Sequence, residues 1–166
     1  MRRCNLLKNS SFNLHEIVSM KSRIITFMAL LLLAACSPKA DTSQPTIEVW
    51  KSPSCSCCSK WVEHLRQDGF NVTIHNETAM KPLKTKLGIP QALASCHTAM
   101  VDGYVIEGHV PAKDIHKLLG EKPSAHGLAV PGMPIGSPGM EQGDRRDTYE
   151  TVLFTSNGES STYVQH

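Results

Sequence analysis

The sequence has no apolar run long enough to cross a bilayer as a helix. Its apolar run IITFMALLLLAA occupies residues 24–35, whereas a spanning helix needs about 20 such residues. The sequence also has no basic stripe beyond its first 35 residues. Five of the 17 Lys and Arg residues and one of the 15 Asp and Glu residues lie in that stretch, so the rest carries a net charge of about −2. Nucleic acid is therefore not an expected partner.

The first 35 residues have the order of a bacterial export signal. Lys21 and Arg23 precede the apolar run, which gives a basic n-region followed by an apolar h-region. The run ends in LAAC, which resembles a lipobox, the motif in which the cysteine, here Cys36, receives a lipid. The alternatives are an ordinary signal with a chance cysteine, or an uncleaved anchor. We expect a lipoprotein signal peptide over residues 1–35, with Met20 as an alternative start of translation.

Lipidation predicts a lipoprotein of the periplasm that is attached to the membrane through its N-terminus. Ser37 follows the lipidated cysteine and is typical of sorting to the outer membrane rather than retention in the inner one. The polar residues 36–45 are typical of a tether. Residues 46–166 have the length of a single domain with one buried core.

The order of predicted elements is typical of a thioredoxin-like α/β fold. Alternating or β-branched segments predict strands, and apolar residues at helical spacing predict helices. The dipeptide Asp102-Gly103 predicts a tight turn between two antiparallel strands, and we expect Gly120 to end the last helix. In chain order the predicted elements are a strand at 46–50, a helix at 58–69, a strand at 71–75, a helix at 79–87, strands at 98–101 and 104–110, and a helix at 111–120.

The C-terminal part is expected to add to that fold. Residues 125–147 are dense in glycine and proline, contain methionines and have few helix signals, so they predict a loop. The segments YETVLF and STYVQ flank a turn, SNG, and predict a C-terminal β-hairpin. His166, the last residue, is expected to be disordered.

Three cysteines lie within four residues at the first strand-to-helix junction. Cys55 and Cys58 form a C-x-x-C pair, and the helix start favours thiolates, which serve both disulfide exchange and metal binding. Cys57 adds a third sulfur, and neighbouring helical residues point about 100° apart. Thiolates arranged in this way favour bridging several Cu(I) ions over enclosing one zinc ion. Copper binding is therefore preferred to redox thiol chemistry, to zinc or another metal, and to a structural disulfide.

Cys96 is the fourth thiol of the expected domain. It lies in ASCHTAM, just before the third predicted strand. In thioredoxin-like folds this position lies against the C-x-x-C loop and usually carries a cis-proline, which is missing here. We expect Cys96 to join the other sulfurs, and a small buried cysteine is the alternative. His97 is either a ligand or a support for one, and His109 is expected to be structural or on the surface.

The C-terminal loop offers further soft ligands. Met133 and Met140 lie among three prolines, and a methionine thioether can bind Cu(I) or act as a hydrophobic plug. We expect the loop to fold over the cysteine site and exclude water. In that position Met133, Met140 or His126 would add to the ligands.

Four sequence motifs are typical of a known family. They are CSCC, CHTA, GYVIEGHVPA and the long block GLAVPGMPIGSPGME. Together they resemble the CopG family of periplasmic copper-resistance proteins, a thioredoxin-like C-x-C-C family, from residue 46 to the C-terminus. The resemblance implies a multinuclear copper cluster bridged by cysteines, and a part in copper tolerance. It carries over Cys55, Cys57 and Cys58 as cluster ligands and Cys96 as the fourth thiolate. It also implies a redox role that interconverts Cu(I) and Cu(II).

We therefore predict a lipid-anchored periplasmic protein that holds several Cu(I) ions, serves copper resistance and homeostasis, and meets other copper-handling proteins. Two other functions stay open. A thiol-disulfide or copper oxidoreductase would be an enzyme, and the thiol-disulfide form needs only the Cys55–Cys58 pair. A copper chaperone would transfer its ions to an acceptor protein, which no sequence feature identifies.

Overall fold

The computed structural model describes residues 45–166. The predicted signal peptide, the lipidation site Cys36 and the tether up to residue 44 lie outside the described residues. Within residues 45–166, none of the helices combines the length and the apolar character that crossing a membrane requires.

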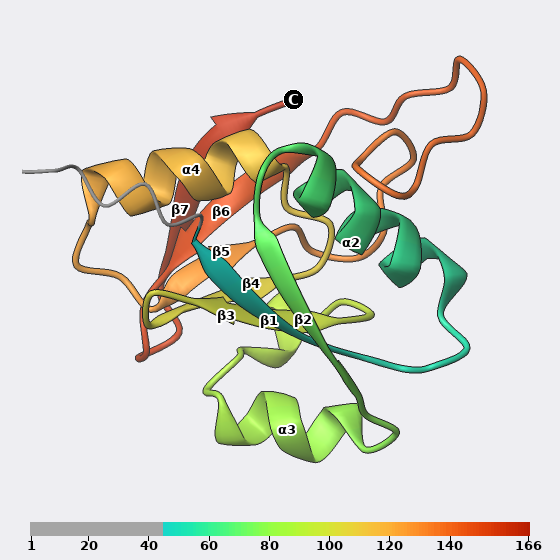
Figure 1. Ribbon diagram of the computed structural model, residues 1–166. Helices are drawn as coiled ribbons and strands as arrows, with labels where there is room; N and C mark the ends of the chain where they lie inside the picture. Colours follow the sequence, from blue (N-terminus) through green and yellow to red (C-terminus); the bar gives the residue numbers. More distant parts are fainter. Residues whose placement is uncertain (1–44) are drawn as a thin grey trace, which may run out of the picture. The chain divides into compact units, whose positions relative to one another are not determined.

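The described residues form a mixed α/β structure, as the sequence predicts (Figure 1). Seven strands build one sheet in the order β2-β1-β3-β4-β5-β6-β7. The strands are β1 (Thr46–Lys51), β2 (Asn71–Asn76), β3 (Thr98–Val101), β4 (Tyr104–Glu107), β5 (Gly127–Ala129), β6 (Glu150–Phe154) and β7 (Ser160–Gln165). The helices are α2 (Ser56–Gln67), α3 (Met80–Lys86), the short 3-10 helix η2 (Gln91–Leu93) and α4 (Ala112–Glu121).

The two faces of the sheet are covered differently. Because side chains alternate along a strand, Ile47 and Val49 of β1 point to one face, where they join the main core. Helices α2 and α4 supply the other half of that core, and α3 lies across the opposite face (Figure 1). The largest buried core side chains on the two helices are Trp61, Leu65, Ile115 and Leu118.

Strand β5 is an addition that the sequence did not indicate, since residues 125–147 were predicted to be a loop. Its three residues are too few to show an alternating pattern, yet it joins β4 in parallel and β6 in antiparallel pairing. Gly127 makes this possible, because a Cβ at that position would overlap the backbone carbonyl oxygen of Val105. The predicted C-terminal hairpin is confirmed as β6 and β7.

Several predicted ends are wrong: the strand predicted at 104–110 ends at Glu107 in β4, and three further ends have a clear cause. Helix α2 begins at Ser56, two residues before the expected start, because Cys55 caps it. Helix α4 runs through Gly120 and stops where Lys122 takes a left-handed conformation, at φ 48°. His166 was expected to be disordered, but its ring stacks on Tyr149 and its Nε2 lies 2.9 Å from a carboxylate oxygen of Asp114.

Gly127 and Gly120 give a matched pair of stability tests. Gly127→Ala should lower the free energy of unfolding by about 3 kcal/mol, the upper end of the usual overpacking effect, because the added methyl meets rigid backbone. Gly120→Ala should raise it by about 0.5–1 kcal/mol, because the methyl meets open space and the helix gains propensity. Urea unfolding of both variants measures the difference, and equal effects would contradict the assigned packing.

Candidate metal centre

The start of helix α2 is surrounded by three cysteines, Cys55, Cys57 and Cys58. Cys55 is the N-cap residue, and its Sγ accepts a hydrogen bond from the Cys58 backbone N–H at 3.3 Å. A sulfur here takes the place of the usual capping oxygen, and once Cys55 is reduced the positive end of the helix dipole stabilises its thiolate. Cys57 and Cys58 follow in the first turn, where Cys58 is fully buried and Cys57 is half-buried.

The structure brings the four predicted sulfur atoms together. Cys55 and Cys58 form a disulfide, and Cys57 and Cys96 are free. The Sγ of Cys57 lies 3.4 Å from that of Cys55, and the Sγ of Cys96 lies 3.5 Å from that of Cys58. All four sulfur atoms lie within 4.8 Å of one another. Reduction of the disulfide therefore yields four thiols in one cluster.

Sheet pairing explains how Cys96 reaches the helix start. Strand β3 runs antiparallel to β1, with Thr98 opposite Trp50. The start of β3 therefore lies beside the end of β1, from which the chain continues into the cysteine loop. Cys96 precedes β3 by two residues, so its side chain arrives at the same edge of the sheet.

His109 lies at the site, although the sequence predicts a structural or surface role for it. Its side chain is fully buried, and its Nε2 lies 3.1 Å from the Sγ of Cys96. Its Nδ1 lies 2.8 Å from the carbonyl oxygen of Pro138. Because a carbonyl can only accept, Nδ1 carries the proton, and the Nε2 lone pair faces the sulfur.

The turn between β3 and β4 could have predicted from the sequence that His109 lies near Cys96. A two-residue turn pairs residues that are equally distant from it. Cys96 stands six residues before Asp102, and His109 stands six residues after Gly103. Extending the observed register, in which Thr98 lies opposite Glu107, by two residues places Cys96 opposite His109.

His97 is also fully buried and lies close to Cys96. Its Nδ1 is 3.2 Å from the Cys96 Sγ, its ring packs on Trp61 at 4.3 Å, and its Nε2 has no hydrogen-bond partner. Burial, followed by the charges of His109 and Lys84, holds the pKa of His97 well below its usual value. Burial lowers the pKa of His109 as well. Both imidazoles are therefore neutral at pH 7 and can act as nitrogen donors to a metal.

The Cys96 thiol is protonated in this state of the protein. Burial, and then the negative charge of a neighbouring Cys57 thiolate, raise the pKa of Cys96 to about 11. A metal must displace this proton, since thiolate is the form that binds.

The Gly/Pro-rich loop contacts the site through its backbone. A Cβ on Gly139, whose φ is 85°, would lie 2.7 Å from the carbonyl oxygen of Cys57. At a second point the Ser95 hydroxyl donates to the carbonyl oxygen of Gly132 at 2.5 Å. Met140 follows the first contact and is half-buried, whereas Met133 follows the second and is 53% exposed.

His126 does not reach the sulfur atoms, in contrast to its predicted role as an additional ligand. Its Nε2 lies 2.7 Å from the carbonyl oxygen of Leu87, and its ring packs on Phe154. It precedes Gly127, which pairs with Val105, whereas His109 follows the opposite end of β4. The parallel pairing of β4 and β5 thus holds the two histidines at opposite ends of these strands.

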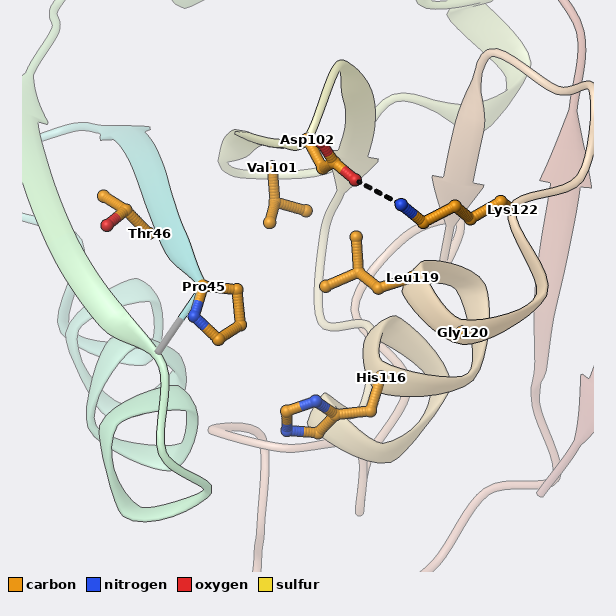
Figure 2. A pocket seen from close by; sticks show the side chains of 8 residues that line it. All are labelled: Pro45, Thr46, Val101, Asp102, His116, Leu119, Gly120 and Lys122. Atoms are coloured by element: carbon orange, nitrogen blue, oxygen red, sulfur yellow. Dashed lines mark ion pairs between the residues drawn. The ribbon is translucent and has the colours of Figure 1, made fainter. Parts of the chain in front are cut away.

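A cavity of about 490 Å³ lies at the other end of β1 and β3, away from the sulfur atoms. Figure 2 shows its lining, in which Asp102 pairs with Lys122 at 3.6 Å beside the side chains of Val101 and Leu119. Its lining residues include no cysteine. The candidate metal centre is the cysteine cluster at the other end of these strands.

The Cys96 environment predicts a pH dependence. With the Cys55–Cys58 disulfide intact, alkylation of Cys96 by iodoacetamide should accelerate with pH and level off only at about pH 11, because only the thiolate reacts. In urea-unfolded protein the same thiol should level off near its ordinary pKa of about 8.5. Mass spectrometry of the Cys96 peptide measures both rates. A plateau below about pH 9 in the folded protein would contradict a pKa raised by burial of the thiol.

Comparisons with known proteins agree with this arrangement. A family described as "Protein of unknown function, DUF411" matches residues 93–140, and a search of curated proteins gave no match. Two solved structures, described as copper resistance protein CopG, Form 2 and Form 1, are each 47% identical to the chain and cover 75% of it. Their TM-scores are 0.72 and 0.71, and 99% and 98% of their own chains are covered. The resemblance noted in the sequence is thus confirmed, and the chain belongs to the CopG family of copper resistance proteins.

Proposed function

We propose that this protein binds copper as Cu(I), its cargo, through the reduced thiolates of Cys55, Cys57, Cys58 and Cys96. The observation that carries the proposal is the gathering of four sulfur atoms within 4.8 Å. Soft thiolates select Cu(I). The two similar solved structures, described as copper resistance proteins, support the choice of copper and a role in copper resistance and homeostasis.

The proposed site holds several copper ions that share thiolates. Cys57 and Cys58 are consecutive residues of α2, so their side chains leave the helix about 100° apart. Thiolates that diverge in this way bridge neighbouring ions more readily than they surround a single tetrahedral ion. Met140 is half-buried and follows Gly139, which contacts the Cys57 carbonyl, so we propose it as an added thioether ligand, whereas the exposed Met133 would have to turn inward.

His109 is proposed as a nitrogen ligand of the same site. Histidines that bind metals commonly donate their second ring N–H to a carbonyl or carboxylate, which fixes the tautomer. The Nδ1–H of His109 donates to Pro138 in this manner. His97 also contacts Cys96 through Nδ1, and no partner holds its Nε2, so we assign it a supporting role through Nδ1.

The proposed scaffold is a thioredoxin-like unit with a C-terminal addition. The order β2-β1-β3-β4, with α2 after β1 and α4 after β4, supports this assignment. Strands β5 to β7 extend the sheet beyond it. Export to the periplasm and lipid attachment at Cys36, which the N-terminal sequence predicts, belong to the same proposal.

A copper titration of reduced protein under argon tests the proposal. We expect several Cu(I) ions per chain and, for Cys57→Ser, a loss of most of this capacity, because the bridging sulfur is gone. His126→Ala is the matched control and should load like the wild type, since His126 lies at Leu87. Metal analysis after desalting measures the ratio, and fewer than about one ion per wild-type chain would refute the cluster.

A thiol-disulfide oxidoreductase is the second candidate, favoured by the Cys55–Cys58 disulfide. Its chemistry needs only this pair, so Cys57→Ser should retain insulin reduction if that is the function. On the copper proposal, wild-type protein reduces insulin no faster than Cys55→Ser does. Oxidation of the pair withdraws two of the four sulfur ligands, which makes metal binding dependent on thiol redox state and leaves room for a Cu(I)/Cu(II) role.

A further inference from the structure

A buried ionic cluster lies directly beside the turn that carries Cys96 and His97. Glu107, at the end of β4, is completely buried, and its Oε1 accepts from the Lys84 ammonium at 2.5 Å. The same oxygen accepts from the backbone N–H of Ser95 at 2.6 Å. Its Oε2 accepts from the Thr98 hydroxyl at 2.6 Å, and that hydroxyl accepts from Lys84 at 2.8 Å.

These hydrogen bonds hold the chain on both sides of Cys96 and His97. Ser95 immediately precedes Cys96, and Thr98 immediately follows His97. The carbonyl of His97 is held in addition by the backbone N–H of Gly108. One carboxylate therefore ties together the two ends of the turn that carries a proposed thiolate ligand and its imidazole neighbour.

Stability alone gives little reason for this cluster. Lys84 is the residue that α3 buries, so the helix docks through a charge rather than through an apolar stripe. Replacing a buried ion pair by apolar side chains of similar size is often neutral or stabilising. An apolar pair could dock α3 equally well, but it could not accept hydrogen bonds from Ser95 and Thr98.

We propose that Glu107, held in place by Lys84, is a positioning residue that keeps the Cys96 sulfur against the cysteine helix. The inference rests on the proposed copper function for its purpose but not for its geometry. Glu107 contacts no sulfur and acts through the backbone of the turn. Helix α3 thereby becomes part of the support of the metal centre, although it contributes no ligand.

The test compares two double variants that both remove the charge pair. Lys84→Met/Glu107→Leu removes every acceptor for Ser95 and Thr98, whereas Lys84→Met/Glu107→Gln keeps a carbonyl oxygen in place. The control Asp114→Leu/Thr151→Val removes another buried carboxylate–threonine bond, of 2.6 Å, on α4 and β6. For each protein we would measure the apo melting temperature, the alkylation rate of Cys96 in reduced apo protein, and the transfer of Cu(I) to a chelator.

We expect the Leu double variant to fold, to alkylate Cys96 several-fold faster, and to hold Cu(I) about 10- to 100-fold more weakly, the usual effect of losing a partner that orients a ligand. The Gln variant should recover most of both properties, and the control should match the wild type in both. If the Leu variant fails to fold, Thr98→Val removes a single donor and should give a smaller acceleration in the same direction.

The positioning role would be wrong if the Cys96 alkylation rate and the copper retention were unchanged in a folded Leu variant or in Thr98→Val. The cluster would then have a structural role only. Failure of the wild-type protein to bind Cu(I) would overturn the proposed function instead. The alkylation comparison needs no metal and would still decide the role of Glu107.

Discussion

The two-residue turn at Asp102-Gly103 fixes the register of the β3–β4 hairpin, and the candidate metal centre depends on that register. Both residues have positive φ, 48° and 83°, as a turn of this kind requires. The register sets Cys96 across from His109, and the pairing of β3 with β1 sets both beside the start of α2. Residues that are far apart in sequence therefore meet at one edge of the sheet.

Burial then sets the chemical state of the groups that meet. The imidazoles of His97 and His109 are neutral and the Cys96 thiol is protonated, because charged forms lose their hydration inside the protein. Soft neutral or anionic donors in a site of low polarity suit Cu(I), and each thiol must release a proton to bind it. The contact between Gly139 and the Cys57 carbonyl closes one side with backbone atoms.

Much of this arrangement could be predicted from the sequence. Short-range signals sufficed for the strand-to-helix cysteine loop, the Asp102-Gly103 turn and the β6–β7 hairpin, because each depends on residues close in the chain. Strand β5 escaped prediction because it exists only through its neighbours in the sheet. Gly120 continues its helix because its backbone does not take a left-handed conformation, and Lys122 supplies the left-handed end instead.

In the site, too, features that depend on nearby residues could be predicted, whereas those that depend on strand pairing could not. The three cysteines at α2 and Cys96 were identified from their residue type and position, but His109 looked ordinary until the hairpin register was applied to it. His126 appeared to belong with the methionines because it lies close to them in sequence. The parallel pairing of β5 places it at the far end of the strand instead. The Glu107 carboxylate gave no sequence signal, because alternation alone cannot show that a buried charge has three donors.

Copper K-edge X-ray absorption of the Cu(I)-loaded protein decides whether reduced cysteines bridge several copper ions. We expect a copper environment dominated by sulfur, with a further scattering contribution from neighbouring copper ions. A spectrum dominated by nitrogen and oxygen, or a sulfur environment without copper–copper scattering, would contradict this expectation.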